Sequence, residues 1–193
     1  MGMKAAAKFK FGSEILENRN IFVQGIGNVG EALVEHLVNE GANVTITDIS
    51  QDRLEDVRTK YGVSIYKGND IYSEPMDIYA PCALGATIKD ATIQTLKAKV
   101  VAGAANNQLA DEIKHGRLLQ EKGIVYAPDF LINAGGLINV YSEIAKYDEA
   151  ESFRRTKEIY FRIWIALWIN VPIIWRIGET GEEKQEFHQR YHQ

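Results

Sequence analysis

The sequence is poor in cysteine and has no excess of basic charge. Its one cysteine, Cys82, cannot form a disulfide within the chain, and nothing at the amino terminus reads as a signal peptide, so we expect a protein of the reducing cytoplasm. The formal net charge of −4 argues against a nucleic-acid-binding protein, which needs a basic surface. The remaining composition, 46% hydrophobic and 25% charged residues, is typical of a globular chain that can bury a core.

Internal repeats are missing too, and so is a hydrophobic run long enough to cross a membrane. The most apolar uncharged stretch extends from Ile163 to Trp175 and contains Asn170 and Pro172. It is shorter than the ~20 apolar residues that a helix needs to span a bilayer. We therefore expect no membrane-spanning segment.

The most informative feature that is present is a glycine-rich turn, Gly25-Ile26-Gly27-Asn28-Val29-Gly30, which follows an apolar strand. Gly25 permits a tight turn, Gly27 leaves room for a pyrophosphate, and Gly30 lets the following helix pack closely on the sheet. The N–H groups at the start of that helix face the phosphates. This arrangement indicates a dinucleotide-binding loop.

A second apolar strand ends on Asp48, about 20 residues beyond the glycine-rich turn. A carboxylate at this position accepts hydrogen bonds from the ribose hydroxyls of NAD and repels the additional phosphate of NADP. The combination predicts a site for NAD. The alternative is a glycine-rich turn of an α/β fold that binds nothing.

Strands and helices alternate along the rest of the chain. We expect strands at about 20–24, 43–48, 63–66, 77–80, 99–102 and 124–126, and helices at about 3–11, 28–40, 50–60, 88–97 and 109–121. This alternation predicts parallel βαβ units and hence an α/β fold, a doubly wound, mostly parallel sheet of the Rossmann type with a C-terminal helical extension. We assign residues 1–150 to this dinucleotide-binding domain and residues 151–193 to an apolar helix and a polar tail.

Three motifs of small and amide residues follow later strands of the expected sheet, at 80–86, 102–108 and 127–136. Small residues let a flat ring lie against the backbone, and an asparagine offers both a donor and an acceptor to a carboxamide. Helix capping alone also explains these asparagines. Because the motifs share the sheet edge with the glycine-rich turn, we favour contact with a ligand.

Five motifs in order resemble the cofactor-binding half of the amino-acid dehydrogenases that act on glutamate, leucine, phenylalanine or valine, with the wording nearest to the leucine enzymes. The resemblance covers about residues 1–160 and rests on residues 2–8, 25–30, 81–86, 104–109 and 133–136. It implies an enzyme that oxidatively deaminates an L-amino acid and passes a hydride to NAD.

The same resemblance implies roles for individual residues. The pyrophosphate would be held by Gly25, Gly27, Asn28, Val29 and Gly30, and the adenosine ribose by Asp48. The nicotinamide end would be lined by Ala83, Asn106 and Asn133.

In this family a substrate domain that supplies the catalytic lysines and an acidic residue precedes the cofactor domain. This chain opens at Met1, close to the linker that leads out of that domain, and Lys4, Lys8 and Lys10 are expected on an exposed helix face. We therefore assign no catalytic residue and expect a binding module that does not turn over amino acids by itself.

Residues 159–177 depart from the family pattern, because Phe161, Trp164, Ile165 and Trp168 stand where charged or polar residues are expected. All three tryptophans lie in this segment. We expect a helix over residues 159–171 that ends before Pro172. Its excess apolar surface favours either a homodimer contact or a protein-binding helix, while a helix that covers this chain's own core explains one side of it.

This broken surface pattern leaves two origins open. One is a redesigned Rossmann scaffold that presents the tryptophan-rich helix for protein binding or self-association, and the other is a divergent natural fragment. The polar tail contains His188 and His192, which lack a third ligand and so predict no metal site.

Overall fold

The computed structural model describes residues 1–134 and 149–168. Its strands are β1 (Asn20–Gln24), β2 (Asn43–Thr47), β3 (Ser64–Ile65), β4 (Ile78–Pro81), β5 (Val100–Val101) and β6 (Val125–Tyr126). Its helices are α1 (Gly2–Phe11), α2 (Asn28–Asn39), α3 (Gln51–Tyr61), the 3-10 helix η1 (Ile71–Ser73), α4 (Asp90–Thr95), α5 (Glu112–Glu121), α6 (Asp129–Ile132) and α8 (Glu149–Trp168). None of these helices is long and apolar enough to cross a membrane.

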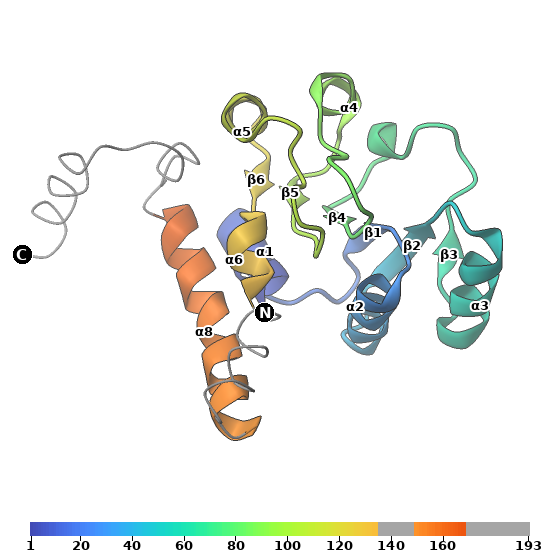
Figure 1. Cartoon of the computed structure of the whole chain (residues 1–193), viewed down its shortest axis with the longest axis horizontal. Coiled ribbons are helices and arrows are strands. Elements are labelled where there is room, and N and C mark those ends of the chain that lie inside the picture. Colours follow the sequence, from blue (N-terminus) through green and yellow to red (C-terminus); the bar gives the residue numbers. More distant parts are fainter. Residues whose placement is uncertain (135–148, 169–193) are drawn as a thin grey trace, which may run out of the picture.

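The six strands form one sheet in the order β3-β2-β1-β4-β5-β6, and every described pair is parallel (Figure 1). The chain moves outward from β1 to β3 and then crosses back to place β4 on the other side of β1. Gln24, at the end of β1, lies opposite Thr47 on one side and Pro81 on the other. The expected doubly wound Rossmann sheet is confirmed, and its switch point, where such sheets bind ligands, lies between β1 and β4.

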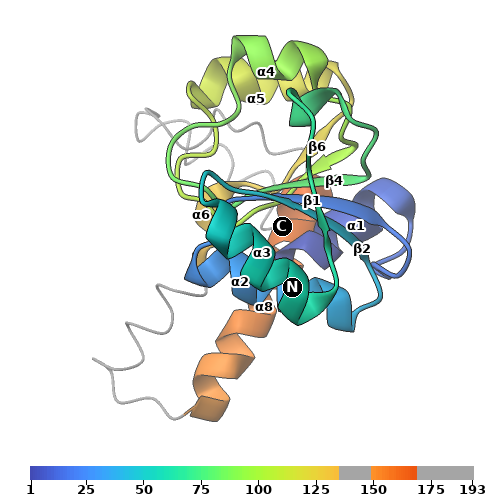
Figure 2. The ribbon, with the colours of Figure 1, turned by 90° about the vertical axis from the view of Figure 1, so that its right-hand side faces the viewer.

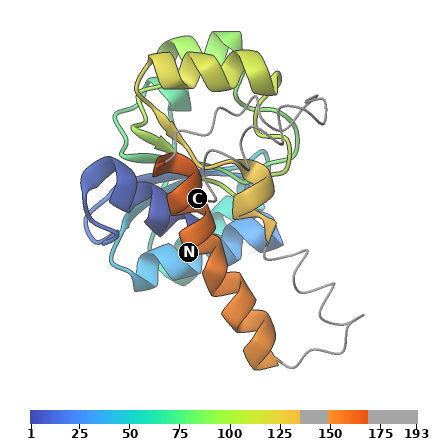
Figure 3. The same cartoon turned by 90° about the vertical axis from the view of Figure 1, so that its left-hand side faces the viewer.

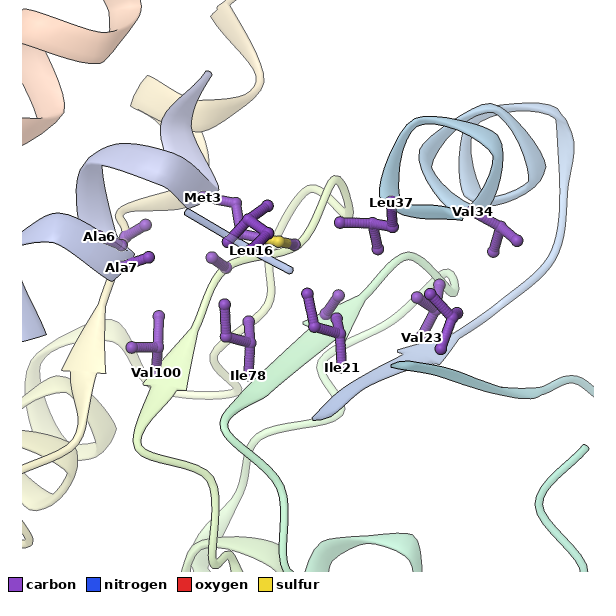
Figure 4. Packing of buried hydrophobic residues seen from close by; sticks show 14 of the residues in the cluster. Met3, Ala6, Ala7, Leu16, Ile21, Val23, Val34, Leu37, Ile78 and Val100 are labelled. Atoms are coloured by element: carbon purple, nitrogen blue, oxygen red, sulfur yellow. The ribbon is translucent and has the colours of Figure 1, made fainter. Parts of the chain in front are cut away.

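Helices cover both faces of the sheet. In Figure 2, α4 and α5 lie above it and α1, α2, α3 and α8 lie below it. Alternate residues of β1 serve the two layers, because Ile21 and Val23 belong to the buried cluster on the α1–α2 side while Phe22 packs against the cluster on the α4–α5 side. Figure 4 shows the first cluster, in which Leu37 of α2 lies over β1. Burial of each such side chain contributes on the order of 1.5–3 kcal/mol.

Most helices begin or end at residues that the sequence predicts as caps. Ser50 caps α3 by accepting a hydrogen bond from the Arg53 N–H, and Gly12 and Gly62 end α1 and α3 in the left-handed conformation. The helices α4 and α5 begin later than expected. Ile88 and Leu109, which the helical patterns included, pair instead in an isolated parallel bridge, and Asp111 then caps α5.

The first helix packs against the last described one. Ala5, Ala6 and Ala7 are fully buried, and α1 contacts α6, α8, β5 and β6. A Cβ added at Gly2 would lie 2.6 Å from side-chain atoms of both Ile132 and Ile163. Small residues therefore allow α1 to lie close between the sheet and α8.

The helix α8 confirms the expected helical conformation from residue 159 as far as Trp168, while 169–171 and Pro172 lie outside the described residues. Figures 2 and 3 show its carboxyl-terminal half against the body of the protein and its amino-terminal half projecting away. In the projecting half, Arg154 pairs with Glu151 and Glu158, at 2.8 and 2.6 Å. Such pairs between residues three or four apart support a helix that has few tertiary contacts.

One side of α8 belongs to this chain's own core. Ile159 and Ile163 are buried in the cluster with α1, and Trp164 is half-buried against the same cluster. Phe161 and Ile165, by contrast, are 65% and 48% exposed. Of the four residues expected on an outward face, these two are placed there, Trp164 contacts the core, and the side chain of Trp168 lies outside the described residues.

Candidate functional site

The glycine-rich turn connects β1 to α2 at the switch point. Gly25 has a φ of +98°, and an added Cβ would lie 2.4 Å from the Ala83 backbone nitrogen. At Gly30 an added Cβ would lie 2.0 Å from the Gly25 carbonyl oxygen. Both positions require glycine, because any side chain would displace backbone.

Gly27 differs from its two neighbours. Its φ of −78° suits any residue, and an added Cβ would meet nothing within 4 Å. Gly27 is the N-cap of α2 and supplies no side-chain cap, and the helical hydrogen bonds begin with Glu31 N–H donating to its carbonyl at 2.8 Å. The N–H groups of Asn28 and Val29, in the first turn, have no acceptor within the helix, and the Cβ position of Gly27 beside them is open, an arrangement that suits a phosphate.

The first turn of α2 also contains an acidic residue, Glu31. Its carboxylate accepts a hydrogen bond from Lys60 Nζ at 2.8 Å, and this bond holds the pKa of Glu31 below its usual value. Lys60 thus offsets the one negative charge of the turn, which favours an anion at this helix end.

Asp48 lies beyond the end of β2 and is hydrogen-bonded to the glycine-rich turn. Its Oδ2 accepts from the Ile26 N–H at 2.6 Å, and its Oδ1 accepts from the Ser50 N–H at 2.9 Å. The sequence pattern assigned Asp48 to a ribose and missed this contact with the loop. A carboxylate has about four acceptor positions, so ribose hydroxyls can still donate to it.

The loops after β4 and β5 continue the same edge. Cys82 N–H donates to the Gln24 carbonyl at 2.7 Å, and Ala105 N–H donates to the Pro81 carbonyl at 2.9 Å. These bonds extend the parallel ladder and place Ala83 directly against Gly25. Burial raises the pKa of the Cys82 thiol to about 11, so this side chain is a neutral thiol at physiological pH.

Asn106 and Asn133, from separate motifs, meet at this edge. Asn133 Nδ2 donates to the Asn106 Oδ1 at 3.2 Å and to the Ala105 carbonyl at 2.9 Å. The structure thus brings both asparagines together on the β5 side of the edge, while Ala83 lies against Gly25 of the glycine-rich turn.

Polar residues next to this pair were not predicted from the sequence. Gln108 is fully buried and its Nε2 donates to the carbonyls of Gly103 and Ala105, at 2.9 and 3.0 Å. Its N–H donates to Asp129 Oδ2 at 3.2 Å, and Asp129 N–H donates to the Tyr126 hydroxyl at 3.2 Å. The available signal was the presence of Gln108 and Asp129 inside two of the motifs, but their burial is a property of the packed loops.

A second group of missed residues lies under β1 and β4. The Gln24 side-chain oxygen accepts hydrogen bonds from the hydroxyls of Tyr72 and Tyr79, and Thr87 Oγ1 lies 3.0 Å from the Tyr79 hydroxyl oxygen. This cluster ties η1 and the loop after β4 to the strand that carries the glycine-rich turn.

Three large apolar side chains are exposed on the loops of this edge. They are Val29 at the start of α2, Ile49 after β2 and Leu84 after β4. The side chains of Ile49 and Leu84 have no cover at all in the described structure, with exposures of 105% and 102%. Apolar groups beside phosphate-binding N–H groups suit a ligand that combines flat rings with phosphates.

Comparison with known proteins identifies the family. The model of the glutamate/leucine/phenylalanine/valine dehydrogenases matches residues 46–160. The chain belongs to the glutamate/leucine/phenylalanine/valine dehydrogenase family. Leucine dehydrogenase of Bacillus subtilis (strain 168) is 48% identical over 189 residues, which cover 96% of this chain and 52% of that protein.

Two solved dehydrogenases of this group show the extent of the structural match. L-tryptophan dehydrogenase from Nostoc punctiforme matches with a TM-score of 0.84 at 41% identity, covering 89% of this chain and 53% of that chain. Hetero-hexameric glutamate dehydrogenase from Thermus thermophilus, at 20% identity and a TM-score of 0.64, shares the fold. The chain spans about half the length of the curated relatives that it matches.

The comparisons also bear on the unusual apolar segment. The alignment with the Bacillus subtilis dehydrogenase covers 96% of this chain and therefore includes most of residues 159–177. The hypothesis of a redesigned scaffold finds no support in it. Within the described residues no cluster of histidine, cysteine, aspartate and glutamate could hold a metal ion, and His188 and His192 lie outside that part of the chain.

Proposed function

We propose that this chain is the NAD-binding part of a leucine-dehydrogenase-like oxidoreductase that deaminates branched-chain L-amino acids. The observation that carries the proposal is the open space at Gly27 beside the uncapped start of α2. Leucine and related amino-acid dehydrogenases of this family are NAD-dependent. The pyrophosphate would lie over Gly25, Gly27 and Gly30 and accept from the N–H groups of Asn28 and Val29.

The remaining parts of the cofactor follow from the order of the loops along the edge. Asp48 would accept the hydroxyls of the adenosine ribose, and Ala83, Asn106 and Asn133 would line the nicotinamide. When bound, NAD supplies a carbon that accepts a hydride. The residues of this chain hold the cofactor and set the face that the nicotinamide presents.

By itself, the 193-residue chain should bind the cofactor without oxidising an amino acid. Its assigned residues bind and orient a cofactor, and none is assigned to holding an amino acid or moving its protons. We expect the purified chain to produce no NADH from NAD with leucine, valine or phenylalanine, as followed by absorbance. Amino-acid-dependent reduction that is abolished by Gly27→Trp would contradict this.

Binding at Gly27 is tested by Gly27→Val. Because an added Cβ meets open space and the φ is ordinary, this variant should fold with a loss of only about 1 kcal/mol, the cost of valine at an N-cap, while its side chain occupies the proposed pyrophosphate position. In calorimetric titrations we expect NAD affinity to fall at least about tenfold, since lost phosphate contacts of ~1.4 kcal/mol give that factor. Unchanged NAD affinity would reject the site.

Gly123→Ala provides the matched control. Gly123 also has open space at its Cβ, but its φ is +68° and it lies after α5. Alanine there should lower stability by about 1 kcal/mol because of the strained backbone and leave NAD affinity unchanged. The two variants thus separate loss of binding from loss of fold.

A helix displayed for protein binding is the weaker alternative. The structure gives α8 a place in this chain's own core through Ile159, Ile163 and Trp164. Only Phe161 and Ile165, among the four assigned residues, have exposed side chains in the described part of the chain.

A further inference from the structure

The loop that carries Asn106 is closed on itself by a buried amide. Both protons of the Gln108 NH2 group are engaged, because Nε2 donates to the Gly103 carbonyl and to the Ala105 carbonyl. We propose that Gln108 is a positioning residue that holds Asn106 in the orientation that binds the nicotinamide carboxamide. This inference rests on the proposed function of NAD binding at this edge.

The end of the loop is fixed as firmly as its middle. The Gln108 N–H donates to Asp129 Oδ2, which attaches the loop to the start of α6. Between the exposed Asn106 and the buried Gln108, Asn107 adopts a left-handed conformation with a φ of 55°. Asparagine tolerates this conformation, which turns the chain from the exposed Asn106 and Asn107 to the buried Gln108.

Gln108 and Asn133 share one acceptor. The Ala105 carbonyl receives the Gln108 amide at 3.0 Å and the Asn133 amide at 2.9 Å. Asn133 in turn donates to the Asn106 Oδ1 at 3.2 Å. A continuous path therefore leads from the buried amide to Asn106, and it fixes which end of the Asn106 amide faces away from Asn133. That end is the NH2 group, which can donate to the carboxamide oxygen of a nicotinamide.

The buried amide also carries a cost. In the described part of the chain the Gln108 Oε1 is buried without a hydrogen-bond partner. A buried acceptor without a donor is unfavourable, and an apolar side chain of the same shape would avoid it. The two bonds of the NH2 group offset this cost, because they satisfy the Gly103 and Ala105 carbonyls and hold them together, which no apolar side chain could do.

Gln108→Met tests the proposal, since methionine has nearly the same shape and lacks the donors. NAD and ADP-ribose are titrated into the full chain, because ADP-ribose retains the groups placed at Gly27 and Asp48 and lacks the nicotinamide. The wild type should bind NAD more tightly than ADP-ribose. In the variant NAD affinity should fall roughly three- to tenfold, the factor of one neutral hydrogen bond, while ADP-ribose affinity stays within about twofold.

Gln94→Met is the matched control, because Gln94 is an exposed glutamine of α4 and its replacement should change neither titration. The fluorescence of bound NADH adds a readout that a general loss of stability does not mimic. Emission from the reduced nicotinamide should resemble that of free NADH in the Gln108 variant, although the molecule remains bound through its ADP part.

The outcomes separate this inference from the proposed function. Wild-type chain that binds neither ligand overturns both. Wild-type chain that binds ADP-ribose as tightly as NAD overturns the inference and leaves the phosphate site standing. Equal losses for both ligands in Gln108→Met, or no loss for either, overturn the positioning role.

If Gln108→Met fails to fold, Asp129→Asn weakens the bond that attaches Gln108 and its loop to α6, and Asp129 is not among the residues proposed to line the nicotinamide. This substitution leaves the Gln108 bonds to Gly103 and Ala105 in place. We expect the same selective loss of NAD affinity, and an unchanged ratio of NAD to ADP-ribose affinity would overturn the proposal.

Discussion

Between β1 and β2 the carboxyl edge of the sheet is formed by main chain, whereas beyond β4 it is held by side-chain amides and a buried carboxylate. In the first half, Gly25 and Gly30 allow backbone to approach backbone, and the groups proposed to contact the ligand are N–H groups. In the second half, Gln108, Asn133 and Asp129 connect the loops through their side chains. The first half depends on the absence of side chains and the second on their hydrogen-bonding groups. Adding a side chain should therefore disrupt the first half, whereas removing side-chain donors or acceptors should disrupt the second.

The largest effect should come from adding one methyl group to the main-chain half. In Gly30→Ala the new Cβ would lie 2.0 Å from the Gly25 carbonyl oxygen, so the turn must move. We expect the free energy of unfolding to fall by at least about 2 kcal/mol, within the range of severe overpacking. Denaturant unfolding measures this.

Gly27→Ala is the control for that prediction, because the same methyl group there meets open space. Its free energy of unfolding should stay within about 1 kcal/mol of the wild type. Equal stabilities for the two variants would show that the close approach at Gly30 does not support the fold.

A smaller effect is expected from Asp48→Asn, which changes the side chain that the main-chain half does use. An amide at this position keeps one oxygen, so it cannot accept from both the Ile26 and Ser50 N–H groups and also from a ribose. NAD affinity should fall about 10- to 100-fold, the range of a lost charge-assisted hydrogen bond, and the preference over NADP should disappear. Calorimetry with both cofactors measures the change.

Asp52→Asn makes the same change of charge at an exposed residue in the first turn of α3 and should leave both affinities unaltered. A retained preference for NAD in Asp48→Asn would remove Asp48 from ribose recognition.

The smallest effect of a substitution concerns the chemical labelling of Cys82, which lies between the two halves. Burial raises the pKa of its thiol to about 11, and a hydrogen bond from the Ala104 backbone offsets part of that rise. Because the thiolate is the reactive form, alkylation should be slow at pH 8 and accelerate about tenfold per pH unit up to about pH 11. Mass spectrometry after timed labelling measures the rate.

Gln108→Met should accelerate that labelling a few-fold, because Ala104 belongs to the loop that Gln108 closes. Gly27→Ala should leave the rate unchanged. Equal rates in all three proteins would mean that the order of the loop does not depend on the buried amide.

The contrast between the halves also explains what could be predicted from the sequence. The turn after β1, the helix ends at Gly12 and Gly62 and the end of β2 near Asp48 are encoded by residue types with local conformational preferences, and the structure confirms them. The assigned binding roles of the nine edge residues remain proposals. Their proximity, however, follows from the parallel topology that the alternating pattern predicted.

What was not predictable depends on contacts between distant segments. No local pattern indicates that Ile88 pairs with Leu109, and that pairing shortens two expected helices. The burial of Gln108 likewise requires α6 to lie above the loop after β5. In α8, the apolar residues are distributed around the helix, and only packing against α1 decides that Ile163 is buried and Phe161 is exposed.

The position of α1 has a consequence for how the chain folds during synthesis. Within this sequence α1 is made before every strand, yet its buried alanines and Gly2 lie against α6 and α8, which follow the last strand of the sheet. Until α6 and α8 have been made, much of its apolar side therefore has no native surface to cover it, although β1, α2 and β2 can already associate. Because closure of such long loops is slow, we expect a late, rate-limiting step in which the two ends of the described chain dock. The small side chains that let α1 pack so closely also offer little apolar surface for non-native contacts before it docks.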